Sequence, residues 1–371
     1  MRACVLTQRS VFNDELWALW EGGFPHVLDK NTLETKREER FGGKVLSKDM
    51  AFTAHAKLVR SKTGQRTLVG LAIDYQQLFM GKAVLTVVEA DEGVPVAQAR
   101  VRAHRLPKDV KGLIVHDFSV TDDWVICVVS PVALSAVKLF LGYAQQDFLG
   151  RGKGCTRVFL LPRAGNGASA IKTFALNDAS HVYHHIGAFV APDGRVVLDV
   201  LATPQLWPLE PQNLHEDMRN PVNRPKVERW VLGDDSGVVE RQRLWGGRTE
   251  DAGACELPIT FRPHHAALYD EVYFIDQSIE REDGVAVEPQ TSIVKLSGLA
   301  SVHGPFACQT WSAPPRTYVG EPAPVEAMGG NAYVLVPLQD MARSVGGLAV
   351  LDAASMRAVA MLWADVWWPT T

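Results

Sequence analysis

Three histidines of the sequence, His55, His116 and His184, are candidates for binding a transition metal. A neutral imidazole is a good ligand for iron, zinc and copper, and a set of histidines can leave coordination positions open. They lie 61 and 68 residues apart, unlike the closely spaced ligands of HExxH helices and cysteine pairs. The sequence also lacks a GxSxG turn, which argues against a serine nucleophile. A metal site is therefore the first chemistry to consider.

The histidines belong to three hairpins of similar pattern, and each is expected on the first strand of its hairpin. The hairpins run from Phe52 to Asp74, from Leu113 to Pro131 and from Tyr183 to Val200, with turns at 62–64, 122–123 and 192–194. On such a strand His116 would share an apolar face with Ile114 and Phe118. A single histidine in this setting is as a rule a hydrogen-bonded core residue. Three in equivalent positions favour a shared metal site.

The rest of the chain favours an all-β fold. Short β-rich segments separated by Gly, Pro, Asp and Asn recur throughout, whereas segments with helical period are scarce. We expect one domain over residues 1–371. Because a hairpin cannot bury both of its faces alone, such units would pack radially as a propeller or face to face as a sandwich. The pattern of strands leaves both architectures open.

Composition excludes several classes of partner. Of 371 residues, 38 are basic and 42 acidic, and these charges are spread along the chain, so nucleic acid is not an expected partner. The five cysteines are far apart and form no CxxC pair, which favours a reducing, intracellular compartment. Which compartment stays open: the cytoplasm or, if the source is a photosynthetic eukaryote, a plastid. The longest uncharged segment, 125–137, is too short to span a bilayer.

One segment has helical period. Its apolar residues recur at three- and four-residue steps and are Leu134, Val137, Leu141, Ala144 and Phe148. We therefore expect a surface helix over 134–148. Its apolar face has two interpretations, docking on the rest of the fold or peripheral contact with a membrane surface.

Several segments, in this order along the chain, resemble those of the carotenoid cleavage oxygenase family. They are LWALWEGGFPHVLDKNTLETK (16–36), FTAHAKLVRSKTGQ (52–65), LIVHDFSVTDDWVICVVSP (113–131), VFLLPRAG (158–165), YHHIGAFVAPDGRVVLDV (183–200), ELP (256–258), VGEP (319–322) and GLAVLDAASMRAVA (347–360). The first resembles the family's L-x-E-x-G-x-P stretch, and the third resembles its H-D-F segment.

The resemblance implies a seven-bladed β-propeller with Fe(II) on its axis, held by four histidines. It carries over His55, His116 and His184 as three of the ligands. It also carries over Glu256 and Glu321 as glutamates that accept a hydrogen from the outer nitrogen of a ligand histidine. It further implies that the family's opening blade and another such glutamate precede residue 1, and that the fourth histidine follows WWPTT (367–371). We therefore expect an incomplete propeller.

The implied activity is that of a non-haem Fe(II) dioxygenase. Its partners would be dioxygen and an apolar polyene, a carotenoid, apocarotenoid or similar conjugated alkene, cleaved at a double bond to two carbonyl products. A second class stays open, a truncated or decayed propeller that binds an apolar ligand or a protein without iron. Retention of three histidines favours the enzyme, and the expected loss of the fourth favours the alternative. With an incomplete ligand set we expect weak iron binding and little turnover.

Overall fold

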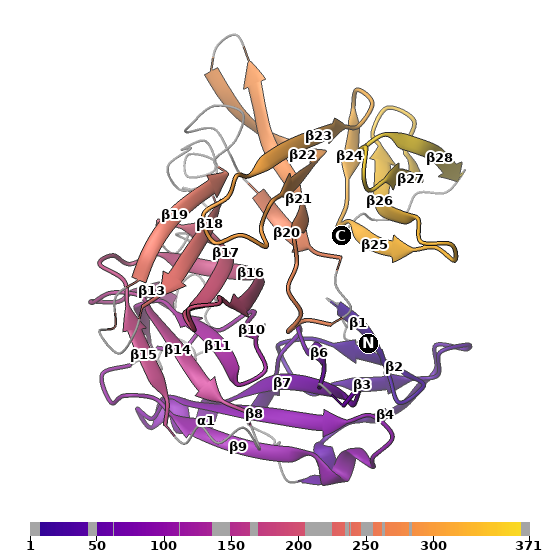
Figure 1. Cartoon of the computed structure of the whole chain (residues 1–371). Coiled ribbons are helices and arrows are strands. Elements are labelled where there is room, and N and C mark those ends of the chain that lie inside the picture. The colour runs from indigo at the N-terminus through magenta and orange to yellow at the C-terminus, as the bar shows by residue number, and fades with distance from the viewer. Residues whose placement is uncertain are drawn as a thin grey trace.

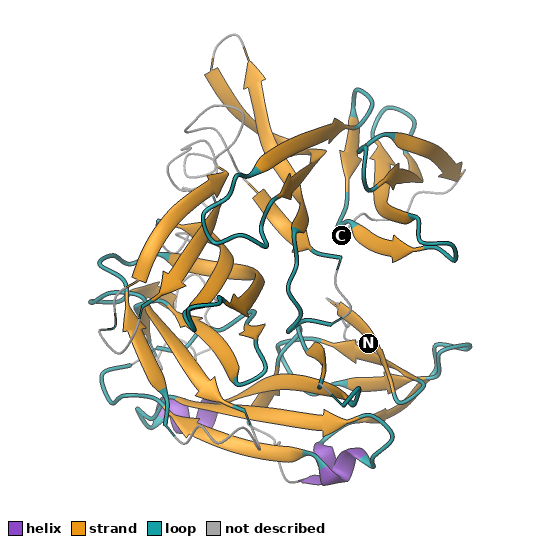
Figure 2. Ribbon diagram, in the orientation of Figure 1, coloured by secondary structure: helices purple, strands orange, loops and turns teal. Residues whose placement is uncertain are grey.

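The computed structural model describes most of the chain, and nearly all regular structure in it is β-strand (Figure 2). The described residues are 8–43, 50–61, 63–110, 112–135, 149–163, 170–204, 225–233, 237, 239–245, 255–261, 264–281 and 284–364. Six sheets of four or five strands follow one another along the chain. They are arranged around a centre, toward which the opening strands of the sheets lie (Figure 1).

The first three sheets cover the N-terminal half. The first contains β1 (Gln8–Phe12), β2 (Glu15–Leu19), β3 (His26–Leu28) and β4 (Thr35–Glu38). The second contains β5 (Met50–Phe52), β6 (Lys57–Arg60), β7 (Arg66–Asp74), β8 (Val84–Asp91) and β9 (Arg100–Arg105). The third contains β10 (Ser119–Val120), β11 (Trp124–Val129), β14 (Arg157–Pro162) and β15 (Lys172–Ala175). A separate pair is β12 (Val132–Leu134) with β13 (Leu149–Arg151).

The other three sheets follow in the same way. The fourth contains β16 (His181–Val190), β17 (Val196–Thr203), β18 (Lys226–Leu232) and β19 (Val239–Trp245). The fifth contains β20 (Cys255–Ile259), β21 (Glu271–Arg281), β22 (Gly284–Ser297) and β23 (Ala307–Ser312). The sixth contains β24 (Thr317–Val319), β25 (Ala323–Glu326), β26 (Ala332–Asp340), β27 (Val345–Asp352) and β28 (Ala358–Ala364).

This architecture is a β-propeller, which confirms the all-β prediction and decides against the sandwich. The part of the chain that the structure describes contains six blades, not the seven of the complete propeller that the resemblance implies. Blade number cannot be read from repeat length here, since β10, with two residues, and β16, with ten, both open their sheets.

The core lies between successive blades, so the strands must be apolar on both faces. On β17, Val197 and Leu201 pack into a cluster shared with the fifth sheet, whereas Leu198 and Val200 pack into a cluster shared with the third. Successive side chains of a strand point to opposite faces. An unbroken apolar run is therefore the pattern of an inner blade strand, and all eight residues of β17 are buried.

A buried ion pair joins the fourth and fifth blades. Arg229 on β18 donates from Nε and Nη2 to both carboxylate oxygens of Asp199 on β17, at 2.8 and 2.7 Å. Its Nη2 also donates to the Leu299 carbonyl at 2.7 Å, and the Tyr269 hydroxyl donates to Asp199 at 2.8 Å. Both charged side chains are fully buried. Hydrogen bonds on every side are what make such a burial tolerable.

Helices are short in the described residues. They are α1 (Tyr75–Phe79) and the 3-10 turns η1 (Phe41–Gly43) and η2 (Val96–Gln98). Asp74 caps the N-terminus of α1, because its carboxylate accepts a hydrogen bond from Gln77 N at 2.9 Å. The helix expected over 134–148 is wrong at its first residue, because Leu134 belongs to β12. Its other positions, 136–148, lie outside the described residues. Across the described parts of the chain, no helix is long and apolar enough to cross a membrane.

Candidate metal centre

His55 lies in a short bend between β5 and β6, not on a strand as expected. Both strands pair with the same long strand β7, so the bend interrupts one edge of the second sheet. The Thr53 hydroxyl accepts from the backbone N of His55 at 3.0 Å and fixes this bend. The expected hairpin turn at 62–64 follows β6, where Gly64 N donates to the Ser61 carbonyl at 2.9 Å.

His116 also precedes its strand. Residues 112–118 form an irregular segment that enters β10 at Ser119, so the expected alternation of His116 with Ile114 and Phe118 on one strand face is wrong. The hairpin itself is present, because β10 pairs with β11 through Ser119 opposite Ile126 and turns at 121–123.

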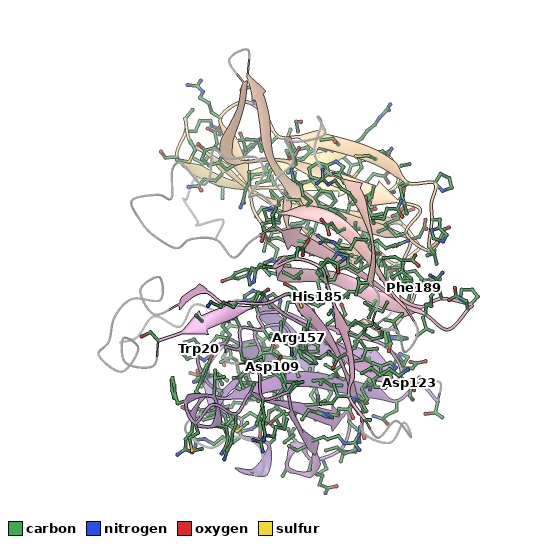
Figure 3. All side chains as sticks on the ribbon, turned by 90° about the vertical axis from the view of Figure 1, so that its left-hand side faces the viewer. Trp20, Asp109, Asp123, Arg157, His185 and Phe189 are labelled. Carbon is green, nitrogen blue, oxygen red and sulfur yellow. The ribbon has the colours of Figure 1, made fainter. Side chains whose placement is uncertain are left out.

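His184 lies on β16, as expected, but in a β-bulge. Val182 pairs with Ala202 and His185 with Val200, so Tyr183 and His184 together face the single residue Leu201. A bulge re-aims side chains and breaks strict alternation. His185 is buried on the other side of the strand and binds the Ser119 hydroxyl through Nδ1 at 3.1 Å. It is labelled near the centre of the molecule in Figure 3.

The structure brings the three histidines together. Nε2 of His116 lies 3.0 Å from Nε2 of His55 and 3.3 Å from Nε2 of His184. One nitrogen from each ring fits within a span of 4.8 Å, and the ring centroids are 4.6 to 5.2 Å apart. The side chains of His116 and His184 are each only 13% exposed. The three histidines thus meet in the geometry that one metal ion would require.

Two glutamates hold two of these rings from behind. Nδ1 of His184 lies 2.6 Å from Oε2 of Glu256, and Nδ1 of His116 lies 2.6 Å from Oε2 of Glu21. A carboxylate only accepts, so each Nδ1 donates its hydrogen. In a neutral ring Nε2 is then a bare lone pair, directed toward the other histidines. Carboxylate partners of this kind fix the tautomer and orientation of metal-binding histidines.

Glu21 corrects one expectation from the sequence. We expected the additional glutamate before residue 1, but Glu21 occupies this role beside His116. It is the acid of the L-x-E-x-G-x-P stretch, so the signal was present in the motif. Gly22 and Gly23 follow it because a Cβ at either position would come within 2.4 or 2.8 Å of the Trp20 ring.

Glu321 is not placed as Glu256 is. It follows β24, and among the described residues no hydrogen bond joins it to any of the three histidines. The side chain is still accessible to solvent. Desolvation by the surrounding residues raises the pKa of its carboxyl, and the charge of His184 opposes this effect. Its expected contact with a ligand histidine is therefore not observed.

The pKa values of the histidines differ with their surroundings. Burial lowers the pKa of His55 to about 3, so this ring is neutral at physiological pH. Burial would also lower the pKa of His184, but the hydrogen bond to Glu256 and the charge of that carboxylate outweigh it and raise the pKa. A neutral ring is the form that binds a metal.

Tyr183 is a further residue of the site that sequence reasoning missed. Its ring centroid lies 4.7 Å from that of His116 and 6.1 Å from that of His184, and the side chain is 40% exposed. Its position follows from the bulge, which local sequence does not reveal. The tyrosine adds an aromatic surface beside the histidines.

Comparison with known proteins shows the family of the chain. A family model described as retinal pigment epithelial membrane protein matches residues 2–370. The chain belongs to this carotenoid oxygenase family. It is 24% identical over 378 residues to apocarotenoid-15,15'-oxygenase of Synechocystis, a match that covers 96% of this chain and 68% of that enzyme. It is 28% identical over 225 residues to isoeugenol monooxygenase of Pseudomonas putida, covering 60% and 43% of the two chains.

The fold of this chain also matches a solved structure. Cobalt-substituted Synechocystis ACO superposes with a TM-score of 0.79 at 22% identity, over 97% of this chain and 71% of that one. At this identity the likeness supports the propeller fold alone.

Proposed function

We propose that His55, His116 and His184 bind Fe(II), and that the centre serves a dioxygenase that cleaves a carbon–carbon double bond. The substrate class would be a carotenoid, apocarotenoid or similar conjugated alkene, and the products two carbonyl compounds. Membership of the carotenoid oxygenase family supports the reaction class. The names of the relatives above support conjugated alkenes, both long and short.

One observation carries the metal proposal. His116 and His184 both donate Nδ1–H to carboxylates, and their Nε2 atoms face each other at 3.3 Å. Two lone pairs at this distance repel each other unless a proton or a metal ion lies between them, and a metal ion can bind these two nitrogens and that of His55 together. Imidazole nitrogens suit a ferrous ion, and two carboxylates behind them offset its charge. The donor set therefore fits Fe(II).

The protein's own part in the reaction is positioning. When bound, Fe(II) supplies an open coordination position at which dioxygen is activated. Glu21 and Glu256 hold the rings in the tautomer that keeps Nε2 free. The Tyr183 ring, beside His116 and partly exposed, offers an apolar face against which a flat conjugated chain can lie. Orientation of one double bond at the centre is the main catalytic contribution expected of the protein.

Anaerobic titration with Fe(II), followed by elemental analysis, tests the proposal. We expect weak but measurable binding of iron by the wild-type chain, as an incomplete ligand set implies, and loss of this binding in His116→Ala, because one of three ligands and the Glu21 contact disappear together. Iron-loaded protein should then bleach an apocarotenoid or oxidise isoeugenol under oxygen at a low rate, with two carbonyl products by mass spectrometry. A wild-type chain that retains no iron would contradict the proposal and favour the non-catalytic alternative.

A further inference from the structure

A second set of contacts lies directly behind the three histidines. It consists of Lys57, Asp117 and the backbone N of His185, which stand two, one and one residue after His55, His116 and His184. The three segments that carry the histidines thus meet twice, once at the imidazoles and once at this second set. They come from three different blades, the second, third and fourth.

Asp117 is the centre of these contacts. Its Oδ1 accepts from Lys57 Nζ at 2.6 Å, and its Oδ2 accepts from His185 N at 2.8 Å. Its Oδ1 also accepts from Phe118 N at 2.7 Å, which fixes the carboxylate on its own segment. The Lys57 and Asp117 side chains are 8% and 3% exposed. Every bond from Asp117 is therefore made away from solvent.

Stability alone does not account for such a pair. Replacing a buried ion pair by neutral residues of similar volume often leaves stability unchanged or raises it, because removing two charges from water is costly. What the pair adds is a fixed position for the segments that carry the histidines. The bond to His185 N anchors the β16 bulge that turns His184 inward, and the bond to Lys57 anchors the first residue of β6 after the His55 bend.

We infer that Lys57 and Asp117 are positioning residues that set the distances between the three histidines before metal binds. This inference rests on the proposed metal site and adds to it a determinant of metal affinity outside the ligands and their glutamates. One nitrogen from each of the three rings lies within 4.8 Å of the other two. Preorganisation of this kind requires supporting residues whose own positions are locked by buried hydrogen bonds.

The test is Co(II) titration of Lys57→Met/Asp117→Asn, because Co(II) reports both affinity and ligand geometry through its visible spectrum. The double variant removes both charges together, so neither is left buried and unpaired, and the new side-chain amide oxygen still offers an acceptor to His185 N. We expect Co(II) affinity to fall about tenfold, the lower end of the range for residues behind metal ligands. The spectrum should change, while the melting temperature of the metal-free protein stays close to wild type.

A matched control is Arg229→Met/Asp199→Asn, which removes a buried ion pair from the interface of the fourth and fifth blades. It should leave the Co(II) affinity and spectrum unchanged whatever it does to stability. If the Lys57→Met/Asp117→Asn protein does not fold, Lys57→Gln/Asp117→Asn keeps a hydrogen bond and takes its place, with a smaller loss expected.

The possible results distinguish failure of the inference from failure of the proposed function. Wild-type affinity and spectrum in the Lys57/Asp117 variant that folds would overturn the inference, and so would an equal loss in the Arg229/Asp199 control. Absence of Co(II) and Fe(II) binding in the wild-type chain would instead overturn the proposed function, and the inference with it.

Discussion

Glu256 raises the pKa of His184, so it affects how strongly protons compete with a metal ion for this ring. This gives a prediction about pH. Because the pKa of His184 is raised, metal binding should weaken as pH falls through that raised value, whereas His55, with a pKa of about 3, stays neutral throughout. In Glu256→Gln the raising charge is gone, so the pKa of His184 should fall and the midpoint of metal binding should move to lower pH. Affinity at about pH 8 should drop roughly tenfold, because the ring is held less firmly.

Co(II) titrations between about pH 5 and about pH 8 measure this midpoint. Glu321→Gln is the matched control, since Glu321 makes no hydrogen bond to the three histidines among the described residues, and it should shift the midpoint less. An unchanged midpoint in Glu256→Gln would show that Glu256 does not control the protonation of His184.

At the residue scale, the sequence predicted which histidines form the site better than it predicted which residues contact them. His55, His116 and His184 could be selected by their type and by the motifs around them, and the structure brings them together. The contact between Glu21 and His116 spans 95 residues, so no local pattern reveals it, and the contact between Asp117 and His185 spans 68. Such pairings depend on how the blades pack.

At the scale of elements, turns were predictable and interruptions were not. Gly64 and Gly194 have φ of +88° and +85°, a conformation that favours glycine, and both hairpin turns lie where the sequence placed them. The bend at His55 contains no Gly or Pro, and the residues around it read as one continuous strand. The register of β5 and β6 against β7 decides it instead.

A close contact between β7 and the His55 segment gives a second prediction. The Phe52 ring lies over Gly70 on β7, where an added Cβ would come within 2.0 Å of it, and Phe52 N donates to the Gly23 carbonyl at 2.9 Å. Gly70→Ala should therefore displace Phe52 and cost about 1–3 kcal/mol of unfolding free energy. Because Phe52 precedes the His55 bend, Co(II) affinity should fall as well.

Chemical denaturation and Co(II) titration check both effects. Phe52→Leu in the Gly70→Ala background should recover part of the stability and affinity, since the smaller side chain makes room for the methyl group. Gly70→Ala with wild-type stability and affinity would mean that the contact relaxes without moving the His55 segment.

At the scale of the whole molecule, the fold class followed from the sequence but the blade count did not. Strands buried on both faces, such as β17 and β11, give apolar runs that alternate between two neighbouring cores. This pattern distinguishes a stack of blades from a sandwich once the cores are known. It does not give the number of blades, because each apolar cluster lies between two neighbouring blades and carries no information about the others.

The histidines come from three consecutive blades, so metal binding should stabilise the propeller as a whole. A ligand that binds only the folded state adds about 2.7 kcal/mol when its concentration is 100 times its Kd. We therefore expect Co(II) at such an excess to raise Tm by several degrees, and a chelator to reverse the rise. In His116→Ala/His184→Ala the same addition should leave Tm unchanged, since one imidazole of the centre cannot hold the ion. Differential scanning fluorimetry at several Co(II) concentrations measures the effect, which should grow with the logarithm of concentration. A Tm that rises equally in this double variant would place the bound metal elsewhere in the molecule and contradict the assignment of the centre.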